Sequence, residues 1–231
     1  LVCYDYKNMS KEYGFSQEKF VDVMLAAHLA RGSAPIKNIE QVLGADGYEI
    51  GAVELLAESE NLRTQLAQQG LNELFFDVEQ PLCVVLRNME ERGVRVSTDV
   101  LKALEAKYGA IIQRLTDEIF AITGEPFNIA SPKQLGEVLF DKLGLPHGKK
   151  TKTGYSVSED VLSNLADKHP IVNLVLEYRH YAKLQSTYVV GLQPLVNRGR
   201  IHTEFNQCIT QTGRLSSTNP NLQNIPARSD E

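Results

Sequence analysis

The hydrophobic pattern predicts long amphipathic helices after residue 76. Val78–Arg92 is helical in character and is followed by Gly93, a typical helix end. Ser97 or Thr98 can cap the next helix, which reaches about residue 122 and whose apolar stripe consists of Leu101, Leu104, Tyr108, Ile111, Leu115 and Ile119. The opposite face of this helix is charged, so we expect it to pack on one side only.

Further helices begin at recognisable capping signals. The sequence SPKQ at residues 131–134 predicts a capping box at the start of a helix that runs to Leu143. Ser158 is expected to cap a short helix, and Pro170 is expected to begin a long one that reaches about residue 192.

The segment before residue 76 has α/β character. Residues 1–4 form a short apolar run of strand type that ends at Asp5, and residues 20–29 are apolar enough for a buried helix that carries Asp22. Leucines at near-helical spacing predict another helix over 52–69.

A strand and a polar stretch follow the last helix. After a turn at 197–199, residues 200–208 alternate like one strand, with one side formed by Ile201, Thr203, Phe205 and Gln207. Taken together, the patterns predict a mixed α+β fold that is predominantly helical, with segments at 1–76, 77–197 and 198–231.

Composition and cysteine spacing narrow the class of protein. The chain is 42% hydrophobic and 23% charged, and no apolar run is long enough to span a bilayer, so we expect no membrane partner. The three cysteines, Cys3, Cys83 and Cys208, are isolated in the sequence. We therefore expect neither a disulfide scaffold nor a cysteine zinc site, and we expect the protein to lie in a reducing cytoplasm. The chain begins without methionine and stops just after a motif-like loop, so we expect both ends to lie within a longer protein.

Charge is unevenly distributed along the chain. Residues 1–76 contain six Lys and Arg against eleven Asp and Glu, whereas residues 131–231 contain twelve against nine. A polyanionic partner is therefore expected at the C-terminal part, although a solvated basic face would give the same count.

The candidate chemistry begins with the polar stretch from Gln211 to Arg228. It is rich in amides and hydroxyls, and its only charges are Arg214 and Arg228. Such donors suit the minor groove, whose acceptors at A N3 and T O2 differ little between base pairs. By composition alone an ordinary polar loop is the more common explanation of this stretch.

Two groups of cations are further candidates for phosphate contacts. Lys149, Lys150 and Lys152 lie in a short basic loop, whose glycine and lysine spacing does not fit a nucleotide-cradling phosphate loop. Arg179 and Lys183 are four residues apart on the helix that begins at Pro170, so they share a face where an anion would relieve their repulsion. Solvated surface cations are the alternative for both groups.

Asp5 and Asp22 are candidates for the metal-binding carboxylates of a nuclease, but helix capping or surface placement is the more common role for such residues. His202 is expected to be an ordinary strand residue, because no carboxylate or serine is placed to partner it.

The order of residues resembles the family A DNA polymerases of bacteria. The similarity is carried by FNIASPKQLGEVLFDKLGLP at 127–146, by EYRHYAKLQSTY at 177–188 and by RIHTEFNQCITQTGRLSSTNPNLQNIP at 200–226. The resemblance is strong over residues 77–231 and weak over 1–76. It implies the C-terminal part of an RNase H-like 3'–5' exonuclease-type domain at 1–76, a helical thumb at 77–197 and the first strand and loop of a polymerase palm at 198–231.

The resemblance also implies a function and roles for residues. The parent protein is expected to be a DNA-directed DNA polymerase, a monomeric nucleotidyltransferase of replication and repair that binds primer-template duplex DNA and deoxynucleoside triphosphates. Arg214 matches an arginine at the primer end that approaches the incoming nucleotide, and Arg228 matches a basic residue near the nucleotide site. The expected DNA contacts are Arg179, Lys183, Thr212, Arg214, Asn221, Gln223 and Asn224, together with Lys149, Lys150 and Lys152.

Two departures from the family pattern limit these expectations. In this family, carboxylates hold two Mg²⁺ ions for phosphodiester formation, and the resemblance places them, with the fingers helix, beyond residue 231. We therefore expect no metal site here and no polymerisation by this chain alone. Asp5 and Asp22 match aspartates of proofreading relatives, but Ser59 stands near the position of a metal-binding aspartate, so proofreading is not expected. A non-catalytic duplex-binding module and a remnant 3'–5' exonuclease remain the alternative functions.

Overall fold

A computed structural model describes residues 1–16, 19–44, 51–147 and 154–226. Over these ranges the chain is mainly helical, with three small two-stranded sheets, which confirms the predicted predominance of helix. Two compact units are present: Leu1–Arg95 together with Arg200–Glu231, and Val96–Gly199. The expected boundary at residue 76 lies inside the first unit, and the exonuclease-type, thumb and palm assignments stay predictions.

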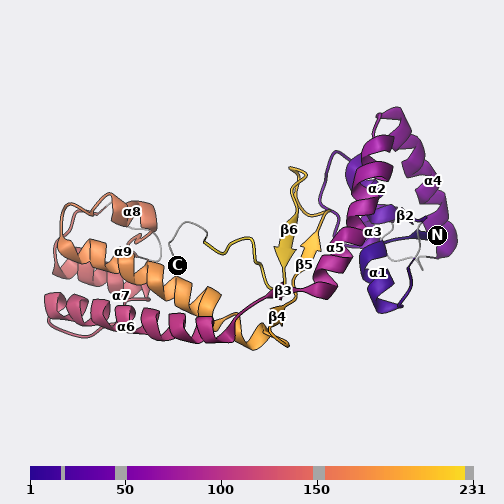
Figure 1. The fold of residues 1–231 in the computed structure, drawn as a ribbon. Helices are drawn as coiled ribbons and strands as arrows, with labels where there is room; N and C mark the ends of the chain where they lie inside the picture. The colour runs from indigo at the N-terminus through magenta and orange to yellow at the C-terminus, as the bar shows by residue number, and fades with distance from the viewer. Residues whose placement is uncertain (17–18, 45–50, 148–153, 227–231) are drawn as a thin grey trace. The chain divides into compact units, whose positions relative to one another are not determined.

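The N-terminal part of the first unit packs helices around a short parallel sheet. Strand β1 (Val2–Cys3) pairs with β2 (Val21–Asp22). Helices α1 (Tyr6–Glu12), α2 (Val23–Ala30), α3 (Ile39–Leu43) and α4 (Ala52–Gln68) surround it (Figure 1). The buried core includes Tyr6, Phe20, Leu25, Leu62, Leu66 and Phe75.

The predicted helix over 20–29 is partly wrong. Residues 21 and 22 form strand β2, and α2 begins only at Val23. Asp22 therefore lies at the junction, where its carboxylate accepts a hydrogen bond from the Leu25 N–H and caps the helix. Capping explains why an aspartate precedes an apolar helix.

Helix α5 (Gln80–Arg92) continues a π-helical segment, Leu74–Glu79, and ends at Gly93 as predicted. Gly93 has φ +67°, and a Cβ at this position would lie 2.9 Å from the His202 ring. Both the backbone conformation and the close approach require glycine here.

The chain returns to the first unit as two strands, and the prediction of one strand over 200–208 is wrong. Strand β4 (Arg200–Ile201) pairs with β3 (Val94–Arg95), whereas β5 (Glu204–Asn206) pairs with β6 (Ser216–Thr218), both antiparallel. The chain changes sheets at His202 and Thr203. His202 Nδ1 lies 2.8 Å from the Glu90 carbonyl oxygen, and the buried Thr203 hydroxyl bonds across the β5–β6 hairpin, so neither residue continues a ladder.

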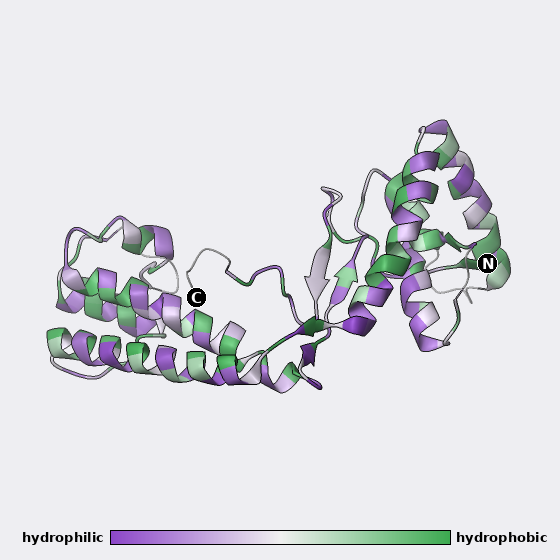
Figure 2. Cartoon of the chain, viewed as in Figure 1, coloured by the Kyte–Doolittle hydropathy of each residue, from purple (hydrophilic) through white to green (hydrophobic). Residues whose placement is uncertain are grey.

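The second unit is a helical layer built on α6 (Thr98–Thr123) and α9 (Pro170–Lys183), which run side by side (Figure 1). Polar and apolar bands alternate along both helices (Figure 2), and the predicted stripe from Leu101 to Ile119 faces the core. The remaining elements are α7 (Pro132–Gly136), α8 (Glu159–Ser163), π-helical segments at Glu137–Lys142 and Leu184–Val190, and a 3-10 turn at Gln193–Leu195.

The predicted capping box at 131–134 is half correct. Ser131 accepts a hydrogen bond from the Gln134 N–H, as expected for the N-cap. The Gln134 side chain instead accepts from the Asn128 N–H at 2.7 Å, which closes the preceding loop.

No helix among the described residues is long and apolar enough to cross a membrane.

Candidate nucleic-acid interface

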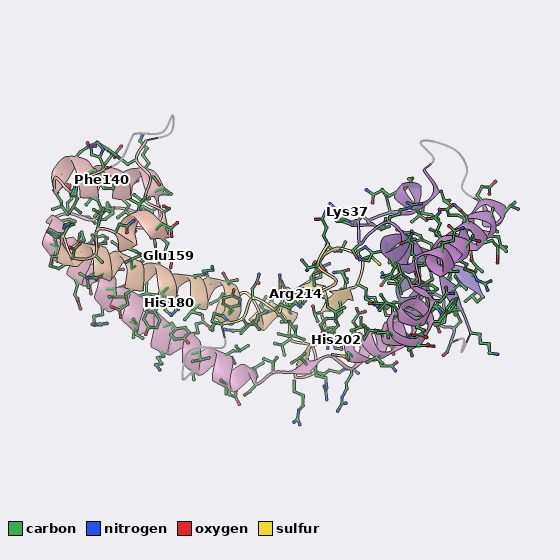
Figure 3. All side chains as sticks on the ribbon, turned by 90° about the horizontal axis from the view of Figure 1, so that it is seen from above. Lys37, Phe140, Glu159, His180, His202 and Arg214 are labelled. Carbon is green, nitrogen blue, oxygen red and sulfur yellow. The ribbon has the colours of Figure 1, made fainter. Side chains whose placement is uncertain are left out.

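The first part of the candidate interface is the loop that joins β5 to β6. Thr212 and Arg214 are both exposed on this loop, and Gly213 between them has φ +69°. Figure 3 labels Arg214. The Thr210 hydroxyl donates a hydrogen bond to the Arg214 carbonyl oxygen. The backbone of the loop is thus held while the guanidinium group of Arg214 stays at the surface.

A buried hydroxyl pair holds the chain after β6. The Thr203 Oγ1 lies 2.8 Å from Ser217 Oγ, and it is also within hydrogen-bonding distance of the Thr218 and Pro220 carbonyl oxygens, at 2.9 and 2.7 Å. The Ser217 hydroxyl in turn accepts from the Leu222 N–H at 3.0 Å. These bonds fix the turn that contains the cis Asn219–Pro220 peptide and leads to the predicted amides.

The predicted amides lie beside the loop that carries Arg214. Asn221, Gln223 and Asn224 are all exposed. The Asn221 side chain accepts from the Gln223 N–H, and the Gln223 amide nitrogen donates to the Leu215 carbonyl oxygen at 2.9 Å. The Gln223 side chain therefore links the 221–224 segment to the residue next to Arg214. The hairpin presents an arginine and several uncharged donors and acceptors on neighbouring segments.

A buried ion cluster supports the hairpin along strand β5. The Glu90 carboxylate accepts hydrogen bonds from Lys7 Nζ and the Phe205 N–H through Oε1, and from Lys11 Nζ through Oε2. Burial alone would raise the pKa of Glu90, but the bonds from Lys11, Lys7 and Phe205 outweigh it and lower the pKa below its ordinary value. Glu90 is therefore charged at neutral pH.

No pattern in the sequence indicates this cluster. Lys7 and Glu90 are 83 residues apart, and Lys7 and Phe205 are 198 apart. Periodicity and local motifs report only on neighbouring residues, so contacts of this range need the tertiary structure.

The second part of the candidate interface lies on α9. Arg179 is half-buried and donates through Nη1 to the Val157 carbonyl oxygen. Burial lowers the pKa of Arg179, which the nearby Glu159 carboxylate partly offsets. Lys183, one turn later, is exposed. Arg179 thus makes a structural hydrogen bond and still has further N–H donors, whereas Lys183 is exposed to solvent.

Four predicted contacts lie outside the described residues: Lys149, Lys150, Lys152 and Arg228. Their expected roles stay predictions.

Asp5 and Asp22, the candidate metal ligands of a nuclease, have a structural role as helix caps. Asp5 caps α1 by accepting from the Asn8 N–H, and it also accepts from the Asn8 side chain at 2.7 Å. Asp22 is buried and accepts from the Tyr6 and Leu25 N–H groups at 2.9 and 3.1 Å. Both carboxylates serve as helix caps, the more common role for such residues.

The Asp22 carboxyl is buried and lies near a second acidic group. Burial, with a smaller contribution from the Asp5 charge, raises the pKa of Asp22 to about 7. Ser59 is buried, and its hydroxyl has no hydrogen-bond partner among the described residues. Across the described part of the chain, no three His, Cys, Asp or Glu side chains are grouped to hold a metal ion.

Comparisons with known proteins agree on one family. The family described as "DNA polymerase family A" matches residues 98–231. The chain is 53% identical to DNA polymerase I of Bacillus subtilis (strain 168) over 178 residues, which are 74% of this chain and 20% of that protein. It is 48% identical to DNA polymerase I of Synechocystis sp. (strain PCC 6803) over 201 residues, 85% of this chain and 20% of that protein.

A solved structure shares the fold. The POL domain of Pol1 from M. smegmatis, in complex with DNA primer-template and dNTP, matches 99% of this chain and 43% of its own with a TM-score of 0.86 and 34% identity. The chain spans about a fifth of the length of the curated relatives it matches.

Proposed function

Because the chain belongs to DNA polymerase family A, we propose that it is part of a DNA-directed DNA polymerase and supplies part of the surface that binds primer-template duplex DNA. The observation that carries this proposal is the β5–β6 hairpin, which holds Arg214 and the amides of Asn221, Gln223 and Asn224 at the surface on a braced backbone. Guanidinium and amide donors suit minor-groove acceptors without selecting a base sequence.

Residues of this surface have two different roles. Thr212, Arg214 and the three amides contact the duplex near the primer end, and Arg214, with Arg228, approaches the incoming deoxynucleotide. Arg179 and Lys183, with the lysines at 149, 150 and 152, meet phosphates, where each neutralised phosphate adds salt-dependent affinity. The matched Pol1 domain is in complex with DNA primer-template and dNTP, which supports DNA and deoxynucleotide as the ligands of this surface.

We assign the segments 1–76, 77–197 and 198–231 to an exonuclease-type domain, a thumb and the start of a palm. Mg²⁺ in a polymerase supplies charge stabilisation for nucleotidyl transfer. We propose that the complete protein supplies the ligands of this ion, and we assign the ion no step here. We further propose a monomer that acts in the cytoplasm in replication and repair.

Two measurements test the proposal. The complete gene product, given Mg²⁺, deoxynucleotides and a primed template, should extend the primer, and an absence of extension would refute the enzymatic role. The 231-residue chain should bind primer-template with an affinity that falls as salt increases. Binding without extension by the complete product would favour a non-catalytic duplex-binding module instead.

A further inference from the structure

Strand β5 is bonded on both of its edges, but by different partners. In an antiparallel ladder, the N–H and C=O of one residue point to the same side of the strand. The Phe205 N–H donates to Glu90 Oε1 at 2.7 Å, and the Phe205 carbonyl oxygen accepts from Lys7 Nζ. Phe205 therefore turns both groups away from its β6 partner, Ser217, and an ion pair takes the place of a third strand.

The Lys7–Glu90 pair that closes this edge is buried. Its side chains are only 9% and 4% exposed. Separating a buried pair leaves an uncompensated charge in the interior, which is strongly unfavourable. Because both members of the pair also bind the Phe205 backbone, strand β5 cannot slide or turn along this edge without losing its hydrogen bonds to two buried charged groups.

Further bonds fasten the strand where it leads into the Arg214 loop. The Gln207 side chain donates to the Glu79 carboxylate at 2.7 Å and accepts from the Cys83 thiol. The Cys208 carbonyl oxygen accepts from the Ile36 N–H at 2.9 Å. The root of the hairpin is thus attached to α1, α5 and the segment before α3.

We propose that Lys7 and Glu90 are positioning residues for duplex binding: through Phe205 they hold the β5–β6 hairpin so that Arg214 meets the DNA. This inference rests on the proposed function of the hairpin. It gives the N-terminal segment a role that needs no nuclease chemistry, since it serves as the scaffold of the DNA-contacting loop.

The chain offers a matched pair of variants. Lys7 and Lys11 both bind the Glu90 carboxylate, but only Lys7 also bonds Phe205. In the full chain, Lys7→Met should speed amide hydrogen exchange of residues 204–206 and 216–218, whereas Lys11→Met should leave these amides close to the parent. Equal exchange at the hairpin in Lys7→Met and the parent would overturn the positioning role.

A double-mutant cycle then connects the pair to DNA. Arg214→Ala should weaken primer-template binding about fivefold or more in the parent and much less in the Lys7→Met background, since residues acting through one arrangement are not additive. In the Lys11→Met background the full effect of Arg214→Ala should persist. Equal losses in the Lys7→Met background and the parent would overturn the link between the pair and DNA binding.

The cycle separates this inference from the proposed function. If Arg214→Ala changes nothing in the parent, the DNA interface and the link to it are both refuted, while hydrogen exchange still decides whether the pair holds the hairpin. Should Lys7→Met fail to fold, Glu90→Gln is the second variant. Its amide oxygen can accept from Phe205 but loses the charge that holds Lys7, so the same changes in exchange and coupling are expected, and their absence would contradict the inference.

Discussion

The Arg179 guanidinium donates a hydrogen bond to the Val157 carbonyl oxygen, which ties helix α9 to the segment that leads into α8. A side chain proposed to meet DNA phosphates therefore also has a structural role. Lys183, one turn further along the helix, is exposed. The two cations should consequently respond differently to substitution.

Arg179→Ala should lower both stability and DNA affinity. Loss of the bond to Val157 is expected to cost about 1 kcal/mol of unfolding free energy, the usual net value of one hydrogen bond. Lys183→Ala should leave the melting temperature unchanged and reduce the slope of log affinity against log salt by about 0.9, the value for one phosphate contact. Thermal melts and salt titrations measure the two effects. An unchanged slope in Lys183→Ala would remove that residue from the interface.

Arg214→Ala should weaken primer-template binding to a similar extent for every duplex sequence. Minor-groove acceptors at A N3 and T O2 are nearly equivalent, so a groove-reading arginine contributes little base selectivity. Binding to a panel of duplexes of equal length tests this expectation. Arg63→Ala, which removes an exposed cation of α4 paired with Glu60, is the control and should bind as the parent does. A loss confined to one sequence would contradict the proposed mode of contact.

Much of the helical architecture was predictable, because periodicity and caps act locally. The stripe from Leu101 to Ile119 and the cap at Ser97 both follow from spacing within one helix. Gly93 could likewise be recognised as a helix end from its position after Arg92.

The failures arose where tertiary contacts decide the conformation. The alternation over 200–208 predicts one strand, but the buried Thr203 hydroxyl and the contact of His202 with Glu90 divide it between two sheets. Likewise, the Gln134 side chain accepts a hydrogen bond from the Asn128 N–H and not from the N–H of the N-cap residue Ser131. The exposed residues of the candidate interface could be predicted because they lie in one continuous stretch that resembles a family motif. The support by Lys7 and Glu90 could not be predicted, because it depends on contacts between residues far apart in the sequence.

The three cysteines should be unreactive in the folded protein. All are buried and free. Burial, together with nearby carboxylate charge, raises the pKa of Cys3 to about 12 and raises the pKa of Cys83 and Cys208 as well. Because the thiolate is the reactive form, a thiol reagent should label none of them at pH 8 in native buffer and all three in denaturant. Rapid labelling of even one cysteine in native buffer would contradict the buried environment.

Asp22→Asn should alter the pH dependence of stability. The pKa of Asp22 is raised to about 7 in the folded state, against about 3.9 for an ordinary aspartate. The folded protein thus holds this proton more tightly than the unfolded chain does. The resulting stabilisation is complete below about pH 4 and is lost as the pH rises through 7.

The asparagine amide introduced by this substitution cannot ionise. Its single oxygen can keep the bond from the Leu25 N–H that caps α2, whereas the bond from the Tyr6 N–H, which Asp22 accepts through its other oxygen, is lost at every pH. Denaturant unfolding at pH 5 and pH 8 should therefore show a smaller loss of stability with rising pH in Asp22→Asn than in the parent. Asp167→Asn, at an exposed carboxylate, controls for a general effect of removing one negative charge and should follow the parent. If Asp22→Asn loses as much stability as the parent between these pH values, the buried carboxylate does not titrate there, and the raised pKa of Asp22 is wrong.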